Sequence, residues 1–442
     1  MKNTKLDNLV NFSKTFTDRE MVHEGGIVTG VARDAITIRG LCEKVSLGYQ
    51  VVIHTRHGRL RAEVIRVDEE VILVKPFNDT IQPILDDYVF VDGNLRIWPD
   101  VSWCGRVINA LAAPLDGLGD LKLGDKGFFV DTYAAPAMQR NRVGNMLFTG
   151  IKVIDIFTPL CFGQRIGVFA GSGVGKSTLL AMMTQTEAFD VVVLALTGER
   201  GREVRDMLDD TLKDKTDKVI TVVSTGDESA MMRRLAPVTA TTIAEAFCAQ
   251  GKNVLLIVDS ITRYALGARE IAIAAQEPPV ARGYPPSVFS QMSRLLERAG
   301  PGIKDSGSIT GIYSVLVDGD DHNDPISDSI RGILDGHIVL DRSIAAQGRF
   351  PAVNIPVSIS RLARECWSVE QKKLVQSFKE MIVAYEDSKD LRAMGVYKPG
   401  GDILLDKAVN IVPVLYDALQ QDIDSPKIED PYAAVASKLR AE

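Results

Sequence analysis

One stretch, residues 165–178, constrains the fold more than any other. It reads Arg-Ile-Gly-Val-Phe-Ala-Gly-Ser-Gly-Val-Gly-Lys-Ser-Thr, and the apolar residues 179–183 follow it. An apolar run, a glycine-rich turn ending in Gly-Lys-Ser and a second apolar run predict a buried strand, a phosphate-binding loop and a helix. Glycines let backbone N–H groups crowd around an anion, and a helix N-terminus adds partial positive charge. The strict pattern has glycine where Ala170 stands, so the match is to its looser form.

Eight residues of this loop are expected to bind a nucleotide: Gly171, Ser172, Gly173, Val174, Gly175, Lys176, Ser177 and Thr178. Lys176 is expected to reach the β- and γ-phosphates, and the Ser177 hydroxyl to bind Mg²⁺. A second apolar run, residues 255–258, ends at Asp259, so a buried strand delivers a carboxylate at its end. Asp259 is therefore the expected Mg²⁺ partner opposite Ser177, either directly or through water.

Hydrolysis also requires a group that activates water and positive charge that stabilises the transferred phosphoryl oxygens. Glu199 lies just beyond the apolar run 191–196, where its carboxylate can polarise an attacking water. Arg263 follows Asp259 by four residues and is expected in the same site. Arg361 is a second candidate, acting either in its own site or across a subunit boundary. The sequence leaves that choice open.

Three patterns follow one another along the chain and predict its domains. Residues 1–24 are expected to dock a partner, and residues 25–92 contain short β-rich runs typical of a small barrel or sandwich. Residues 93–365 alternate apolar runs with helix-length segments, which predicts an α/β domain with a largely parallel sheet covered on both faces. Helical spacing dominates residues 366–442. The strands expected in the middle domain cover 166–170, 191–196, 219–223, 254–258 and 309–317, and the C-terminal residues expected on one helix face are Leu374, Phe378, Met381, Ile382 and Tyr385.

Composition narrows the class of protein. With 442 residues, of which 45% are hydrophobic and 25% charged, the chain can form two or three domains with a large core. The net charge of −7 argues against a general nucleic-acid surface. Five scattered cysteines without a Cys-x-x-Cys pair fit a reducing compartment, and neither a signal peptide nor a membrane span is expected. We therefore expect a cytoplasmic protein that associates with membranes only peripherally.

The order of the motifs resembles that of the hexameric rotary ATPase superfamily, which contains ATP synthase catalytic subunits, vacuolar-type relatives and the ATPases of type III export. The matching segments are 149–155, the phosphate loop, 198–200, 259–263 and 351–360. Further stretches resemble the type III export branch, flagellar or injectisome: 282–289, 318–328 with 334–339, and 385–391. The acidic C-terminal loop expected of a synthase β subunit is not evident, and the similarity covers about residues 25–430.

This resemblance implies a RecA-like core in a homohexameric ring whose ATP sites lie between subunits and use Mg²⁺. Arg200 would join Lys176, Glu199, Asp259 and Arg263 in one subunit, Arg361 would reach in from a neighbour, and Phe350 would stack on adenine. The ring would release chaperones from export substrates and unfold those substrates at the inner-membrane export apparatus, with the flagellar system as the first choice. The partners implied are a stator-like regulator at the N-terminus, a coiled-coil stalk in the pore, chaperone–substrate complexes and the membrane export gate; no nucleic acid is expected.

Three alternatives stay open at this point. A catalytic subunit of an ion-translocating synthase would need noncatalytic companions. A hexameric RNA helicase would need clustered basic residues and aromatics in residues 25–92, and few basic residues cluster there. A noncatalytic nucleotide-binding subunit is disfavoured by Glu199.

Overall fold

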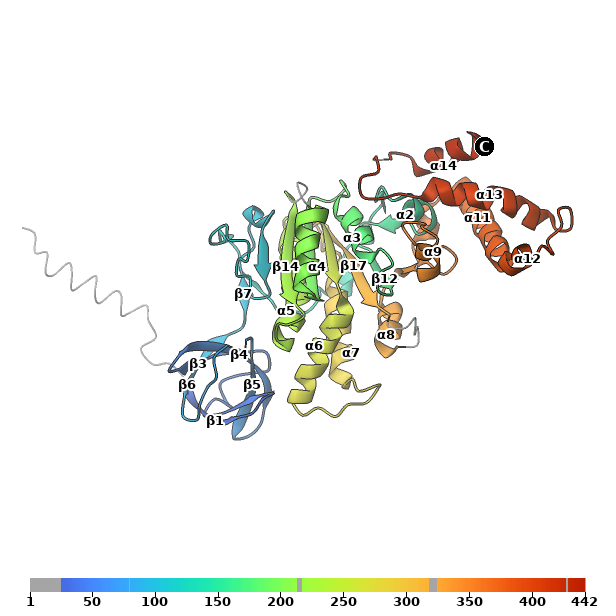
Figure 1. Ribbon diagram of the computed structural model, residues 1–442. Coiled ribbons are helices and arrows are strands. Elements are labelled where there is room, and N and C mark those ends of the chain that lie inside the picture. Colours follow the sequence, from blue (N-terminus) through green and yellow to red (C-terminus); the bar gives the residue numbers. More distant parts are fainter. Residues whose placement is uncertain (1–24, 79, 213–216, 318–323, 427, 442) are drawn as a thin grey trace, which may run out of the picture. The chain divides into compact units, whose positions relative to one another are not determined.

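The computed structural model describes residues 25–78, 80–212, 217–317, 324–426 and 428–441 (Figure 1). The proposed docking segment 1–24 and the first six residues of the acidic motif 318–328 lie outside these ranges. Contacts divide the chain into two compact units. The first ends at Leu95 and includes Glu270–Pro278, and the second comprises Arg96–Arg269 and Pro279–Glu442.

The first unit contains a closed barrel of six antiparallel strands. Alternate residues of its strands point inward, and Val28, Ile38, Val51 and Ile53 are fully buried in its core. The prediction for residues 25–92 allowed a barrel or a sandwich, and the structure has the barrel. The strands pair in the order β1-β2-β5-β4-β3-β6, closed by β1 on β6: β1 (Gly25–Val31), β2 (Ile36–Arg39), β3 (Gln50–Thr55), β4 (Gly58–Val67), β5 (Val71–Pro76) and β6 (Tyr88–Gly93).

The second unit is built on the predicted parallel sheet, in which the expected strands form within one to three residues of their predicted ends. Only β19 and the short β16 (Gly300–Pro301) run antiparallel to their neighbours. The strand at one edge, β8, was not among the strands expected from the sequence. The order across the sheet is β19 (Ile359–Ser360), β18 (Gly336–Leu340), β12 (Arg165–Ala170), β17 (Ser308–Leu316), β15 (Asn253–Asp259), β13 (Val191–Glu199), β14 (Val219–Thr225) and β8 (Val107–Asn109).

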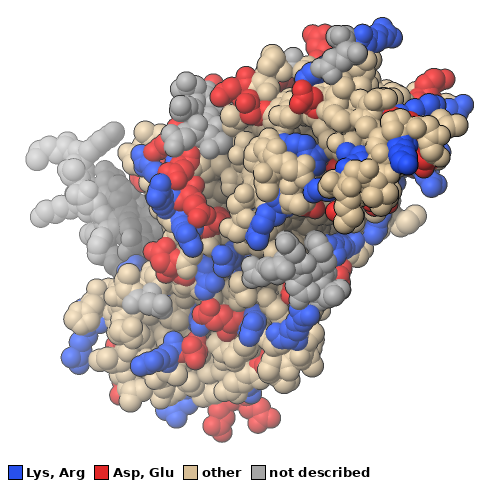
Figure 2. All heavy atoms as spheres, turned by 45° about the vertical axis from the view of Figure 1, so that its right-hand side comes forward, with Lys and Arg blue, Asp and Glu red and all other residues tan. Residues whose placement is uncertain are grey.

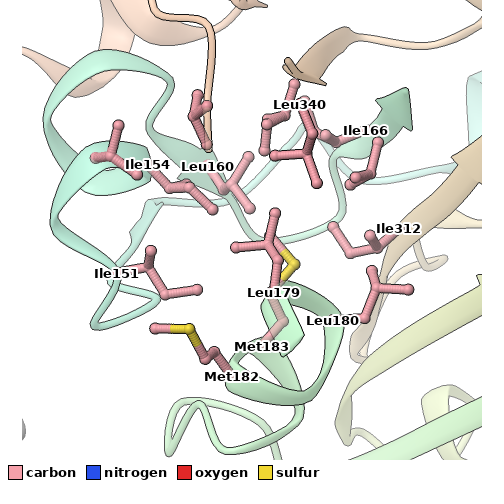
Figure 3. Packing of buried hydrophobic residues seen from close by; sticks show 14 of the residues in the cluster. Ile151, Ile154, Leu160, Ile166, Leu179, Leu180, Met182, Met183, Ile312 and Leu340 are labelled. Atoms are coloured by element: carbon pink, nitrogen blue, oxygen red, sulfur yellow. The ribbon is translucent and has the colours of Figure 1, made fainter. Parts of the chain in front are cut away.

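Helices pack on this sheet as the alternating pattern predicted. On one face, Val192, Leu194 and Leu196 of β13 share a buried cluster with Leu179 and Leu180 of α3 (Lys176–Thr184). Figure 3 shows α3 packed in that cluster beside the segment of α2 (Lys152–Phe157). The alternate residues of β13 point the other way, and α5 (Ala230–Cys248) contacts β13, β14 and β15. The remaining helices of this region are α4 (Gly201–Asp206), a π-helical turn at Met207–Leu212, α6 (Ile261–Ala274), α7 (Pro286–Arg298), α8 (Pro325–Ile333), α9 (Arg342–Ala346) and α10 (Ala363–Cys366).

Short elements precede the phosphate-loop strand. β7 (Arg96–Ile97) pairs with β9 (Phe128–Phe129), and β10 (Met146–Leu147) pairs with β11 (Leu160–Cys161). Single 3-10 turns occupy Val101–Trp103 and Ala137–Gln139. These pairs hold the loop-rich residues that lead into the sheet.

The C-terminal helices join the same buried cluster as the nucleotide-loop helix. α11 (Val369–Asp387) contributes Val375, Phe378, Met381 and Ile382. Leu374, which was expected on the same helix face as Phe378, is 42% exposed. α12 (Lys389–Ala393), α13 (Ile403–Leu419) and α14 (Pro431–Ala441) complete this part of the chain. None of the helices among the described residues has both the length and the apolar character needed to cross a lipid bilayer.

Candidate active site

The phosphate loop has the backbone geometry that its glycines predicted. β12 ends at Ala170, α3 begins at Lys176, and Gly173 and Gly175 between them have φ angles of +76° and +86°. Such angles are open to glycine and strained for other residues. Val174 is buried and anchors the loop, whereas Ser172, Ser177 and Thr178 are exposed.

Lys176 lies between two carboxylates. Its Nζ is 2.5 Å from Asp259 Oδ1 and 3.6 Å from Glu199 Oε1. Asp259 ends β15 and Glu199 ends β13, so parallel strands bring both groups to the edge where β12 delivers the phosphate loop. The Ser314 hydroxyl of β17 donates a second hydrogen bond of 2.5 Å to Asp259 Oδ1.

The pKa of the Glu199 carboxyl is raised. Burial raises its pKa to about 7, and the neighbouring carboxylates of Asp259 and Glu203 add to the rise, while the Lys176 ammonium opposes it. A carboxyl group with a pKa near neutral pH is suited to exchange a proton with water during turnover.

Lys176 and Glu199 line a cavity of about 440 Å³. Its lining includes Lys176, Ser177 and Glu199 together with Arg200 and Arg263. A neighbouring space of about 20 Å³, lined by Ser177, Glu199 and Asp259 among others, has room for about one water. An exposed hydroxyl facing a carboxylate across such a space is a donor set that fits Mg²⁺, which binds oxygen ligands and keeps several waters.

The two arginines of this cavity differ in setting. Arg263 lies in the first turn of α6. A Cβ added to Gly198 would be 2.9 Å from the Arg263 side chain, so the glycine allows this side chain to pack closely against the end of β13. The Arg263 Nε is buried without a hydrogen-bond partner among the described residues. Arg200 precedes α4, with a side chain that is 87% exposed and 3.8 Å from Glu203. Arg263 is therefore held in the cavity wall, and Arg200 lies at its rim.

Phe350 lies beside the phosphate loop. A Cβ added to Gly175 would be 3.2 Å from Phe350 Cδ1, which places the ring against the backbone of the loop. The side chain is 42% exposed, so a ring face stays accessible to solvent. This position fits an aromatic ring that stacks on a nucleotide base.

Arg361 is separated from the other predicted residues. It follows β19, whose Ser360 pairs with Gly336 at the start of β18, and its backbone N–H donates to Asp335 O. The backbone N–H of Asp335 in turn donates to Arg165 O at the start of β12. Arg361 thus lies at the amino end of β12, about 17 Å from its carboxyl end at 3.3 Å per residue. The side chain is exposed, and its Nη2 donates to Arg331 O.

The sequence did not indicate the roles of two residues, one that contacts the site and one that supports the fold beside it. Ser314 lies inside the apolar run of β17, where it gave no signal of its bond to Asp259. Asp155, within the motif 149–155, is buried and accepts hydrogen bonds from Thr149 N–H, Thr149 O–H and Gly150 N–H at 2.8–2.9 Å. It fixes the turn before α2, and its place in a matching motif could have suggested a structural role.

On the face shown in Figure 2, Lys and Arg side chains lie interspersed with Asp and Glu side chains. A nucleic-acid-binding surface typically gathers its basic residues in a patch or stripe. This face therefore gives no support to the helicase alternative.

A parallel sheet with a phosphate loop, a carboxylate at the end of a neighbouring strand and a second carboxylate beside the loop lysine defines a P-loop ATPase. Comparison with known protein families supports this assignment. The family described as "ATP synthase alpha/beta family, nucleotide-binding domain" matches residues 150–360, and "T3SS EscN ATPase C-terminal domain" matches residues 367–436.

Individual relatives cover nearly the whole chain. A "Flagellum-specific ATP synthase" of Agrobacterium fabrum is 51% identical over 99% of this chain and 92% of its own length. A "Type 3 secretion system ATPase" of Xanthomonas euvesicatoria is 37% identical over 90% of each. The structure of the assembled ATPase EscN from the enteropathogenic E. coli type III secretion system is 37% identical, with a TM-score of 0.86 over 94% of this chain and 99% of that one. The chain belongs to the family of flagellum-specific ATP synthases and type III secretion ATPases.

Proposed function

We propose that this chain hydrolyses Mg²⁺-ATP in a homohexameric ring and that turnover drives chaperone release, unfolding and export of substrates in a flagellar type III export apparatus. The observation that carries the proposal is the convergence of Lys176, Glu199 and Asp259 beside the phosphate loop. Lys176 and Glu199 line the larger cavity there, and Glu199 and Asp259 line the small space next to it. The flagellar branch is favoured because the Agrobacterium fabrum flagellar relative is 51% identical, against 37% for the Xanthomonas secretion ATPase.

The residues of this chain divide the chemistry as follows. Backbone N–H groups of residues 171–178 and the Lys176 ammonium hold the β- and γ-phosphates. The Glu199 carboxylate orients the attacking water and accepts its proton. Ser177 and Asp259 would hold Mg²⁺, which supplies neutralisation of phosphate charge when bound. Arg263 adds positive charge from the cavity wall, and Phe350 orients the base.

Arg361 supports a shared site. Because it lies at the amino end of β12, about a strand length from the phosphate loop, its side chain does not reach the cavity of its own subunit. An arginine that stabilises phosphoryl charge can be supplied by a neighbouring molecule. Identical copies arranged in a ring would complete every site in this way, and Arg200 at the cavity rim would lie near that boundary.

Partners follow from the family. One solved relative is EscN "in complex with its central stalk EscO", 36% identical with a TM-score of 0.84. We infer a comparable stalk partner for this chain, together with a stator-like regulator at residues 1–24, chaperone–substrate complexes and a membrane export gate. Location in the cytoplasm, peripheral to the inner-membrane apparatus, belongs to the same proposal.

The test is Mg²⁺-ATPase activity across a protein-concentration series, with Glu199→Gln and Arg361→Ala measured beside the unaltered chain. Specific activity should rise steeply with concentration and be lost in both variants. Mixing the two inactive variants should restore part of the activity, because some interfaces then combine an intact Glu199 with an intact Arg361. Concentration-independent turnover that survives Arg361→Ala would overturn the shared-site mechanism.

A further inference from the structure

Arg349 connects the nucleotide-site loop to two C-terminal helices. It immediately precedes Phe350, and its guanidinium lies 3.8 Å from the centre of the Tyr416 ring of α13. Its Nη2 is 3.5 Å from Glu386 Oε1 of α11. The side chain is only 14% exposed. A cation held over an aromatic face and beside a carboxylate in a partly desolvated position makes a strong, directional link.

The two helical partners of Arg349 are also joined to each other. The Tyr416 hydroxyl donates a hydrogen bond of 2.7 Å to the same Glu386 Oε1. Arg349, Glu386 and Tyr416 therefore form a closed set, which we call the Arg349 latch. Each member holds the other two in place, so a displacement of one disturbs all three.

A cavity beside the latch separates the nucleotide-site loop from the two C-terminal helices. It has a volume of about 380 Å³ and is lined on one side by the segment around Phe350 and Val353 and on the other by Ile382, Glu386 and Tyr416. Val353 and Ile382 share a buried cluster, but in this open space no packed side chains of the described residues join the loop to the two helices. The latch spans this gap with a stack and an ion pair.

The backbone of Phe350 is tied to the same helical region. Gln421, just beyond α13, donates its N–H to Phe350 O at 2.9 Å. Its side chain accepts from Lys152 N–H and donates to Gly150 O. Phe350 is thus held on one side by the phosphate loop at Gly175 and on the other by contacts with the C-terminal helices.

We propose that the Arg349 latch couples the position of the Phe350 ring to α11 and α13, so that Arg349 is a positioning residue through which nucleotide binding is transmitted to the C-terminal helices. The inference rests on the proposed ATP site. A base that moves the Phe350 ring also moves the adjacent Arg349. The stack on Tyr416 and the ion pair with Glu386 are then either lost or carried along with both helices.

The experiment measures amide hydrogen exchange in α11 and α13 of the full chain, with and without saturating Mg²⁺-ADP, so that no turnover is needed. The unaltered chain should show slower exchange in both helices when the nucleotide binds. Arg349→Ala should lose most of that difference, and Tyr416→Phe, which keeps the ring but not the hydroxyl, should lose part of it. In steady-state kinetics, Arg349→Ala should raise KM for ATP by about fivefold to tenfold and change kcat by less than about twofold.

The chain offers a matched control. The Arg392 guanidinium also stacks on a tyrosine, 3.6 Å from the Tyr385 ring, and donates to Tyr385 O and Ser388 Oγ. Within the part of the chain that the structure describes, these contacts stay inside the C-terminal helical region. Arg392→Ala should leave the nucleotide-dependent exchange and KM unchanged. Arg349→Lys keeps the charge without the planar stack and should lie between the unaltered chain and Arg349→Ala.

The experiment distinguishes failure of the proposed function from failure of the latch proposal. If ADP does not bind the unaltered chain, as measured by equilibrium dialysis, the proposed function fails. If ADP binds and slows exchange in α11 and α13 equally in the unaltered chain and in Arg349→Ala, the latch proposal is overturned while the ATP site stands. An equal loss in Arg392→Ala would also overturn it, because general loosening of the helices would then explain the result.

Discussion

Asp259 Oδ1 accepts two hydrogen bonds of 2.5 Å, one from the Lys176 ammonium and one from the Ser314 hydroxyl. Three neighbouring strands of the sheet meet in this contact, because β12 leads to Lys176, β17 carries Ser314 and β15 ends at Asp259. Ser314 is fully buried, and its hydroxyl fixes the carboxylate that faces the phosphate loop. Ser314 is therefore a positioning residue for the site, although it lies behind the groups that touch the nucleotide.

Ser314→Ala should lower kcat about threefold to tenfold, because a misdirected Asp259 carboxylate orients Lys176 less well. Ser308→Ala is the matched control. Ser308 begins the same strand, and its hydroxyl donates to Asn253 at the amino end of β15, away from the phosphate loop. Both variants should lose about 1 kcal/mol of unfolding free energy in urea titrations. Equal activity of the two variants would contradict the positioning role of Ser314.

The pH dependence of turnover should report Glu199. Burial raises its pKa to about 7, so the reactive carboxylate is a minor species at pH 6 and predominates at pH 8. We expect kcat/KM, which reports the pKa values of the free enzyme, to rise with pH around a midpoint near 7 when measured at constant ionic strength. Glu199→Gln should lower kcat by at least about 100-fold, the usual contribution of a positioned base.

Glu203 provides the control for that assignment. Its carboxylate raises the pKa of Glu199, although the Glu203 side chain itself is half-exposed. Glu203→Gln removes the negative charge and should move the midpoint of the kcat/KM profile to lower pH while turnover persists. A midpoint that does not move would show that a different group titrates.

The sequence predicted the elements of the site that depend on short-range pattern. The phosphate loop, Asp259 and Glu199 each follow an apolar run, and parallel strands bring such positions to one edge of a sheet. Their convergence around Lys176 was therefore predictable from the sequence.

The position of Arg361 could not be predicted from short-range sequence pattern. Its distance from the loop depends on β19, a two-residue strand that pairs antiparallel with β18, and no periodicity in the sequence indicates that pairing. The Arg349 latch depends likewise on residues 37 and 67 positions apart that three separate segments bring together. The burial along α11 also depends on packing, because Val375 is buried whereas its neighbour Leu374, at almost the same helical spacing, is 42% exposed.

Phe350→Ala should weaken binding of the base and leave binding of the phosphates intact. Loss of an aromatic stack of about 0.5–1.5 kcal/mol predicts an increase in KM for ATP of about twofold to tenfold. KM for tripolyphosphate, which has no base, should change little, and Phe350→Tyr should behave as the unaltered chain. An equal increase in KM for both substrates would assign Phe350 a structural role at Gly175.

Asp155 should prove to be a stability residue. Its buried carboxyl accepts three hydrogen bonds from Thr149 and Gly150, and burial raises its pKa to about 6 against the lowering effect of those donors. Asp155→Asn turns an amide N–H₂ toward a backbone N–H and should cost about 2–3 kcal/mol of unfolding free energy. Thr149→Val removes only the hydroxyl donor and should cost about 1 kcal/mol. Urea titrations of both variants at one fixed pH measure the two losses. Because the folded-state pKa of Asp155 is raised, the unaltered chain should itself lose stability as the pH rises through 6, and Asp155→Asn should remove that pH dependence. A loss in Thr149→Val as large as that in Asp155→Asn would mean that the hydroxyl, and not the carboxylate, organises the turn before α2.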